Sequence, residues 1–152
     1  MDAEIRKSNP FKVMGVQVRV NPMITDFEDL WHQFLAREAE IAPFSPEKVS
    51  YEAYFKTDQR DLVDCLAGMA VQGVETPPEG VVLREVGGSE EAVFTSQMAT
   101  IKEDWGAIFQ EWMPASGYEH DSTFPEYERY VLDPGGGPPA VTIHIPIRRK
   151  LQ

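Results

Sequence analysis

The feature that most constrains the fold is an internal repeat. The tetrapeptides YEAY (51–54) and YERY (127–130) hold four of the five tyrosines in the chain. Each follows a segment in which large apolar residues recur at spacings of three and four, the pattern of an amphipathic helix. The first helical set recurs 78 residues later, with Phe27, Leu30, Trp31 and Phe34 matched by Trp105, Ile108, Phe109 and Trp112. The helix pattern and the tyrosine-containing tetrapeptide recur in the same order, which favours a duplicated structural unit over chance.

Strand patterns complete the repeat on both sides. The elements expected in the first half are a strand, a helix that Thr25 or Asp26 can cap and two further strands, at 11–20, 24–41, 49–55 and within 62–73. Those expected in the second half are a strand, a helix and two strands around a hairpin loop, at 92–98, 100–113, 126–132 and 140–147. One more strand is expected at 80–88. The order predicts an α+β fold: a single domain of two pseudo-symmetric βαββ modules, about 11–75 and 80–149, with a mainly antiparallel sheet, two long helices and a ligand crevice between the halves.

Composition narrows the class of partner. The chain has 152 residues, 42% of them hydrophobic, which is enough for one domain with a real core. A net charge of −11 opposes the attraction to phosphates on which nucleic-acid binding depends, so no direct nucleic-acid partner is expected. No apolar run reaches the length of about 18–20 residues that a membrane span needs. The absence of a signal peptide and a single cysteine, Cys65, predict a cytoplasmic protein.

Searches for catalytic and metal-binding motifs are negative. The three histidines, His32, His120 and His144, are scattered without metal-ligand spacing. There is no G-x-S-x-G motif, and the prolines of the glycine-rich segment at 133–139 remove the amide donors that a phosphate cradle needs. We therefore expect no cofactor and no metal, and we assign no catalytic residue.

The second half resembles a known family. The pattern VF…IFQEWMPASGYE…PEYERY…VTIHIPI is similar to the gyrase-inhibitor-like small-molecule-binding domain, which is also the effector-binding domain of AraC-type and multidrug-sensing regulators. The first half fits more loosely, so that the resemblance covers about 11–149. It implies two βαββ modules with a hydrophobic crevice and a buried glutamate that meets lipophilic cations.

The resemblance also assigns residues. It places the buried glutamate at Glu128 and Tyr130 in the same motif, while Trp112 and Pro114 match the motif that ends the helix. The chain departs from the pattern at TSQMAT (95–100), where many members have a His and a Gly, which leaves a ligand contact from that loop in doubt. The DNA-binding helices that regulators attach to this domain have no counterpart, so a sensor module alone is expected.

Strand geometry assigns the side chains of each tetrapeptide to two opposite faces. Residues two apart share a face, so that Glu128 lies with Tyr130, and Glu52 with Tyr54 but opposite Tyr51. Glu52 has no support from the resemblance, and a strand glutamate is usually exposed to solvent. The helix aromatic residues can form core as well as a ligand wall. The predicted ligand-binding residues are Glu128, Tyr130, Tyr54, Trp105, Trp112 and Tyr51.

Three functions follow from these features. The favoured one is a cytoplasmic sensor or sequestering protein for lipophilic, cationic small molecules, whose bound state a transcription or DNA-topology protein would read. An alternative is protein–protein interaction, including modulation of DNA gyrase. Another is hydrolysis of strained cyclopropane rings, in which Glu128 would activate water and Tyr130 would donate a proton. An enzyme is less favoured than a binding protein.

Overall fold

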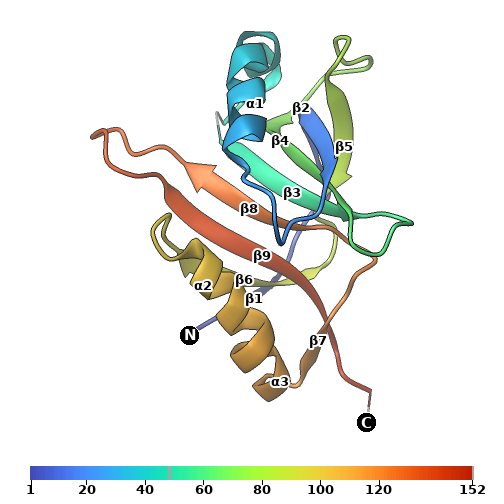
Figure 1. Cartoon of the computed structure of the whole chain (residues 1–152), viewed down its shortest axis with the longest axis vertical. Coiled ribbons are helices and arrows are strands. Elements are labelled where there is room, and N and C mark those ends of the chain that lie inside the picture. The colour runs from blue at the N-terminus through green and yellow to red at the C-terminus, as the bar shows by residue number, and fades with distance from the viewer. Residues whose placement is uncertain (48, 152) are drawn as a thin grey trace.

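The computed structural model describes residues 1–47 and 49–151, whose strands form one nine-stranded sheet (Figure 1). The strand order is β1-β6-β9-β8-β3-β4-β2-β5, with β7 paired to β9, and every pairing is antiparallel. The strands are β1 (Glu4–Lys7), β2 (Phe11–Val20), β3 (Ser50–Lys56), β4 (Val63–Val71), β5 (Val82–Val86), β6 (Glu90–Ser96), β7 (Tyr118–His120), β8 (Glu126–Val131) and β9 (Ala140–Arg149). Strands β3 and β8, which carry the two tyrosine-containing tetrapeptides, lie side by side at the centre of this order.

Two helical segments cover one face of the sheet, one over each half (Figure 1). The first is α1 (Glu28–Ile41) with the 3₁₀ turn η1 (Ala42–Phe44); the second runs through α2 (Ile101–Ala107), the π-helical turn η2 (Ile108–Trp112) and α3 (Met113–Ala115). Leu30 and Phe34 of α1 are buried against β2 and β4, and Ile108 and Met113 are buried against β6 and β9. The predicted α+β class with a mainly antiparallel sheet is confirmed. None of the helices in residues 1–47 and 49–151 is long and apolar enough to cross a membrane.

Two strands were not expected from the sequence. Strand β1 is short, charged and exposed along its whole length, and it is held by pairing with β6 at the sheet edge. Strand β7 lies between the helix expected at 100–113 and the strand expected at 126–132, and it pairs with the end of β9. Helix α1 begins at Glu28 instead of residue 24, and the Asp26 carboxylate accepts a hydrogen bond from the Glu28 amide at 2.9 Å. The predicted cap at Thr25 or Asp26 is wrong in position: the N-cap residue is Phe27, and the Thr25 hydroxyl donates to the carbonyl of Asn21.

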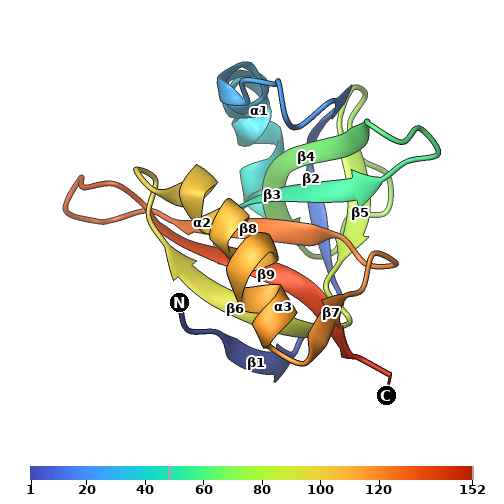
Figure 2. The same ribbon diagram turned by 60° about the horizontal axis from the view of Figure 1, so that its bottom comes forward.

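The sheet is curved, and two short chain connections link one end of it to the other (Figure 2). Residues 8–10 connect β1 to β2, residues 87–89 connect β5 to β6, and the Ser8 amide donates to the Ser89 carbonyl at 2.9 Å. Gly87 makes this corner with φ of +78°, and a Cβ there would lie 2.5 Å from the Ser8 hydroxyl. The sheet therefore has a helix face, under α1 and α2, and an inner face toward the curl, where Val13, Ala53 and Tyr127 are buried.

Candidate functional site

Two glutamates face each other where the halves of the molecule meet. Strands β3 and β8 pair so that Glu52 lies opposite Glu128, with Ser50 opposite Tyr130 and Tyr54 opposite Glu126. Side chains directly opposite in an antiparallel pair point to the same face, with Cβ atoms about 4.5–5.5 Å apart. Only 3% of Glu52 and 4% of Glu128 is exposed. The repeated tetrapeptides thus lie side by side, and their two glutamates form a pair of buried carboxyl groups, which we call the carboxyl pair.

The hydrogen-bond partners of the carboxyl pair are uncharged. Trp105 Nε1 of α2 donates to Glu128 Oε2 at 2.6 Å, and the Tyr130 hydroxyl donates to Glu128 Oε1. The Cys65 thiol of β4 lies 3.7 Å from Glu52 Oε1. Within the described part of the chain, no arginine, lysine or histidine makes an ion pair with either glutamate. The fold therefore buries two acids without supplying a positive partner.

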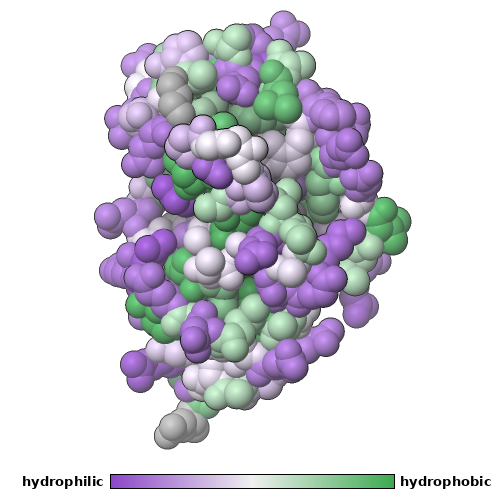
Figure 3. Space-filling view, turned by 90° about the vertical axis from the view of Figure 1, so that its left-hand side faces the viewer, coloured by the Kyte–Doolittle hydropathy of each residue, from purple (hydrophilic) through white to green (hydrophobic). Residues whose placement is uncertain are grey.

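Aromatic rings from both helices surround the pair. The ring of Trp31, from α1, lies edge-on to Tyr130 with centroids 5.3 Å apart. The ring of Tyr54 lies edge-on to two others, with centroids 6.0 Å from Phe27, which precedes α1, and 5.7 Å from Trp105 of α2. Figure 3 shows the side of the molecule from which the β8–β9 hairpin projects, with hydrophobic residues (green) gathered at mid-height among hydrophilic ones. The two acids are thus enclosed by an aromatic wall built from both halves.

Burial and mutual repulsion change the protonation of the site. Burial, followed by the hydrogen bond and the charge of Glu128, raises the pKa of Glu52 to about 9. Burial and the nearby carboxylates also raise the pKa of Tyr54, Tyr130 and Cys65, so these groups are neutral at physiological pH. At pH 7 the Glu52 carboxyl is therefore protonated.

The structure brings four of the six predicted ligand-binding residues together: Glu128, Tyr130, Tyr54 and Trp105. Trp112 lies apart, in the core of the second half, edge-on to Phe94 at 5.1 Å. Tyr51 lies on the inner face, against Phe11 and Tyr127.

Sequence reasoning left out Glu52, Trp31 and Phe27, which the structure adds to the cluster. A signal for Glu52 was present, because it holds the same place in its tetrapeptide as Glu128 does in the other. That signal could not show that the two positions pair.

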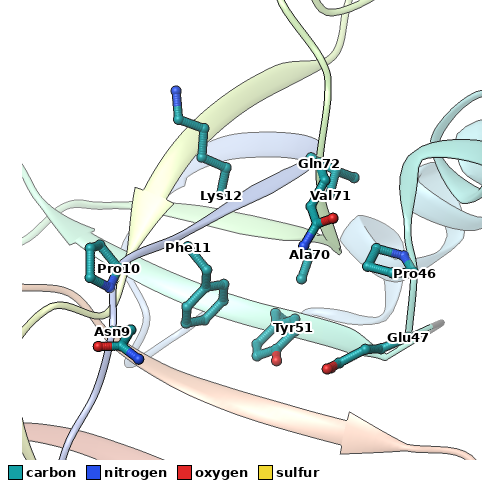
Figure 4. A pocket seen from close by; sticks show the side chains of 10 residues that line it. All are labelled: Asn9, Pro10, Phe11, Lys12, Pro46, Glu47, Tyr51, Ala70, Val71 and Gln72. Atoms are coloured by element: carbon teal, nitrogen blue, oxygen red, sulfur yellow. The ribbon is translucent and has the colours of Figure 1, made fainter.

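Two hollows open on other parts of the surface. One, of about 600 Å³, is shown in Figure 4: Phe11 and Tyr51 form its aromatic part, Pro10 and Pro46 flank them, and the lining includes Lys12. The other, of about 530 Å³, is lined by residues that include Phe55, Arg84 and Phe124. Neither lining includes a glutamate of the carboxyl pair. Among residues 1–47 and 49–151, no group of three or more histidine, cysteine or acidic side chains could hold a metal ion.

Comparison with known proteins points to one family. The sequence pattern of the family described as Cass2, integron-associated effector binding protein, matches residues 4–147. The transcriptional regulator BrlR of Pseudomonas aeruginosa is 28% identical over 151 residues, which is 97% of this chain. The chain spans only 56% of that regulator's length.

Solved structures share the fold. An integron cassette protein from the mobile metagenome of Vibrio cholerae superposes with a TM-score of 0.65 at 22% identity, over 96% of this chain and 95% of that one. The structure of SAV2435 bound to tetraphenylphosphonium gives a TM-score of 0.80 at 8% identity, over 97% and 94% of the chains. The C-terminal domain of EcmrR gives 0.70 at 10% identity, over 98% of both chains. The resemblance to effector-binding domains inferred from the sequence is thereby confirmed.

Proposed function

Because this chain belongs to the integron-associated effector-binding protein family, we propose that it binds lipophilic organic cations at the Glu52–Glu128 carboxyl pair. The observation that carries the proposal is a pair of acids buried at 3% and 4% exposure between aromatic rings, with no basic residue of the described chain paired to them. The fold leaves a negative site that an apolar cation can neutralise.

The physical argument rests on what burial costs. A carboxylate in an apolar site loses its hydration, and a positive ligand group restores the lost interaction. Aromatic faces attract a cation by about 0.5–2 kcal/mol each, with the larger value in desolvated sites. Trp31, Tyr54 and Trp105 supply such faces from α1, β3 and α2. Since the wall offers few hydrogen-bond groups, selectivity would depend on charge and size, and several ligands would be accepted.

The site is closed by its own side chains, which defines what a ligand must do. The indole of Trp105 and the phenol of Tyr130 both donate to Glu128. A cation that approaches Glu128 must take the place of one of these donors, and the rings of Trp105 and Phe109, stacked at 6.2 Å, must shift with it. Tetraphenylphosphonium, the compound bound in the SAV2435 structure, is a lipophilic cation and makes a suitable first probe.

The test is a calorimetric titration with tetraphenylphosphonium. The wild-type chain should bind it, and Glu128→Gln should weaken binding about 100-fold, since an uncompensated charge interaction of about 2–3 kcal/mol is lost. Glu90→Gln is the matched control, because it removes the same charge from an exposed position in β6. An equal affinity in wild type and Glu128→Gln would contradict the proposal.

The same samples separate binding from catalysis. A binding protein returns its ligands unchanged, whereas a hydrolase adds water to them. Mass spectrometry of a compound library that includes strained cyclopropanes, before and after incubation, should show no new masses. Products that disappear in Glu128→Gln would instead support the hydrolase alternative.

A further inference from the structure

The carboxyl pair contains two acids, although one carboxylate would be enough to neutralise a ligand with a single positive charge. Glu52 and Glu128 are in direct register, and both point to the helix face. Two carboxylates at this separation repel each other strongly when both are ionised, so one proton is shared or retained. The pair therefore retains a proton that a second positive charge could displace.

The described groups around Glu52 are neutral or acidic, which favours retention of the proton. Its own strand contributes Tyr54, β4 contributes Cys65, and β8 contributes Glu128 and Tyr130. Helix α2 contributes the uncharged indole of Trp105.

Another acid of β8 has a partner of its own. Glu126, opposite Tyr54 on β8, accepts or shares a hydrogen bond with His120 at 3.1 Å. Helix α1 contributes the ring of Trp31, and the residue before it contributes the ring of Phe27. Among the residues that the structure describes, no arginine or lysine makes an ion pair with Glu52 or Glu128 that would favour loss of the retained proton.

We infer, on the basis of the proposed function, that the Glu52–Glu128 pair discriminates ligands by charge: a monocation binds with the proton retained, and a compact dication binds with that proton released to solvent. A monocation requires only one carboxylate of the pair, and its affinity is independent of pH near neutrality. A dication requires both carboxylates, so its affinity rises as pH rises. Glu52 is thus a specificity-determining residue, distinct from the anchor Glu128.

Two probes of nearly the same shape test this inference. Methyl viologen is a flat aromatic dication, and N-methyl-4-phenylpyridinium is its monocationic counterpart, with a phenyl ring in place of the second pyridinium ring. Titration calorimetry at one pH in phosphate and in Tris buffer measures the protons released, because the two buffers differ in ionisation enthalpy. Methyl viologen should release close to one proton at pH 7, and its affinity should rise about tenfold per pH unit between pH 6 and 8. The monocation should release close to none and show a flat affinity over the same range.

Variants separate the parts of the inference. Glu52→Gln should abolish proton release and remove the pH dependence for methyl viologen. Glu90→Gln should behave as wild type with both probes. Binding of methyl viologen without proton release, or binding of the monocation with no measurable binding of the dication at pH 8, would overturn the inference and leave the proposed function standing. Failure of both probes and of tetraphenylphosphonium would overturn the proposed function itself.

Discussion

The two faces of the sheet each bury an acidic cluster, and the clusters are built in opposite ways. On the inner face, Glu91 is 1% exposed and accepts a hydrogen bond from the Tyr127 hydroxyl at 3.0 Å. The Nδ1 atom of His144 lies 3.2 Å from the same oxygen, and the His144 ring stacks on Tyr127 with centroids 4.4 Å apart. On the helix face, Glu52 meets a second acid, Glu128. The fold supplies Glu91 with a base, while it supplies Glu52 with another acid.

The two clusters differ in what stabilises the buried acid. A buried acid paired with a base stays inside the protein, and loss of either partner leaves an uncompensated group. A buried acid paired with an acid gains nothing from ionisation until a positive group arrives from outside. Adjacent residues of β8 belong to the two clusters, Tyr127 to the inner cluster and Glu128 to the carboxyl pair.

The largest effect on stability is expected from the inner cluster. His144→Leu removes the base beside Glu91 and should lower the free energy of unfolding by about 3–5 kcal/mol, the cost of breaking one side of a buried pair. Urea denaturation at pH 7 measures this. A loss under 1 kcal/mol would show that Glu91 does not depend on His144, and the proposed contrast between the two faces would fail.

Because of the carboxyl pair, the free energy of unfolding should fall as pH rises. The pKa of Glu52 is raised to about 9 by burial and by Glu128, so the folded state binds the proton more tightly than the unfolded state. Its contribution to stability is complete below pH ~4.5, the region of the unfolded pKa, and is lost as pH rises toward 9. Glu52→Gln should therefore unfold with a free energy that declines less from pH 5 to 8, by up to about 1.4 kcal/mol per pH unit.

The control for that measurement is Glu90→Gln, whose pH dependence should match wild type. Parallel curves for wild type and Glu52→Gln would show that the carboxyl of residue 52 titrates normally, contrary to its buried position.

A smaller effect is expected from the aromatic wall. Trp105→Leu keeps an apolar side chain but removes the aromatic face and the Nε1 donor to Glu128. The affinity for tetraphenylphosphonium should fall about five- to tenfold, which corresponds to about 1 kcal/mol for one cation–π contact. Thermal-shift titration against wild type is sufficient for this range. An affinity that rises would mean that the indole mainly competes with the ligand for Glu128.

The smallest effect is expected from Tyr51. It lies in β3 next to Glu52, but its ring packs on the inner face against Phe11, 5.1 Å away. Tyr51→Phe should change the affinity for tetraphenylphosphonium less than twofold by the same titration. A loss of tenfold or more would indicate that the hollow beside Phe11 takes part in binding.

Much of the architecture is local and could be predicted. Apolar spacing in residues 28–41 and 101–113 is set by the helical repeat of each segment, and alternation in 11–20 and 140–147 is set by the strand repeat. The charged, exposed strand β1 carries no such signal, because its conformation is stabilised by pairing with β6.

For the candidate site, too, some features could be predicted from the sequence and others depended on the tertiary structure. The sequence alone determined that the tetrapeptide of Glu128 repeats that of Glu52, and that Glu128 and Tyr130 share a face, because both follow from order and period along one strand. Only the tertiary structure decided that β3 pairs with β8 in the register that sets Glu52 against Glu128, and that Trp31 and Trp105 close over them. Register between strands 76 residues apart depends on how all the elements pack together, and no local pattern specifies it.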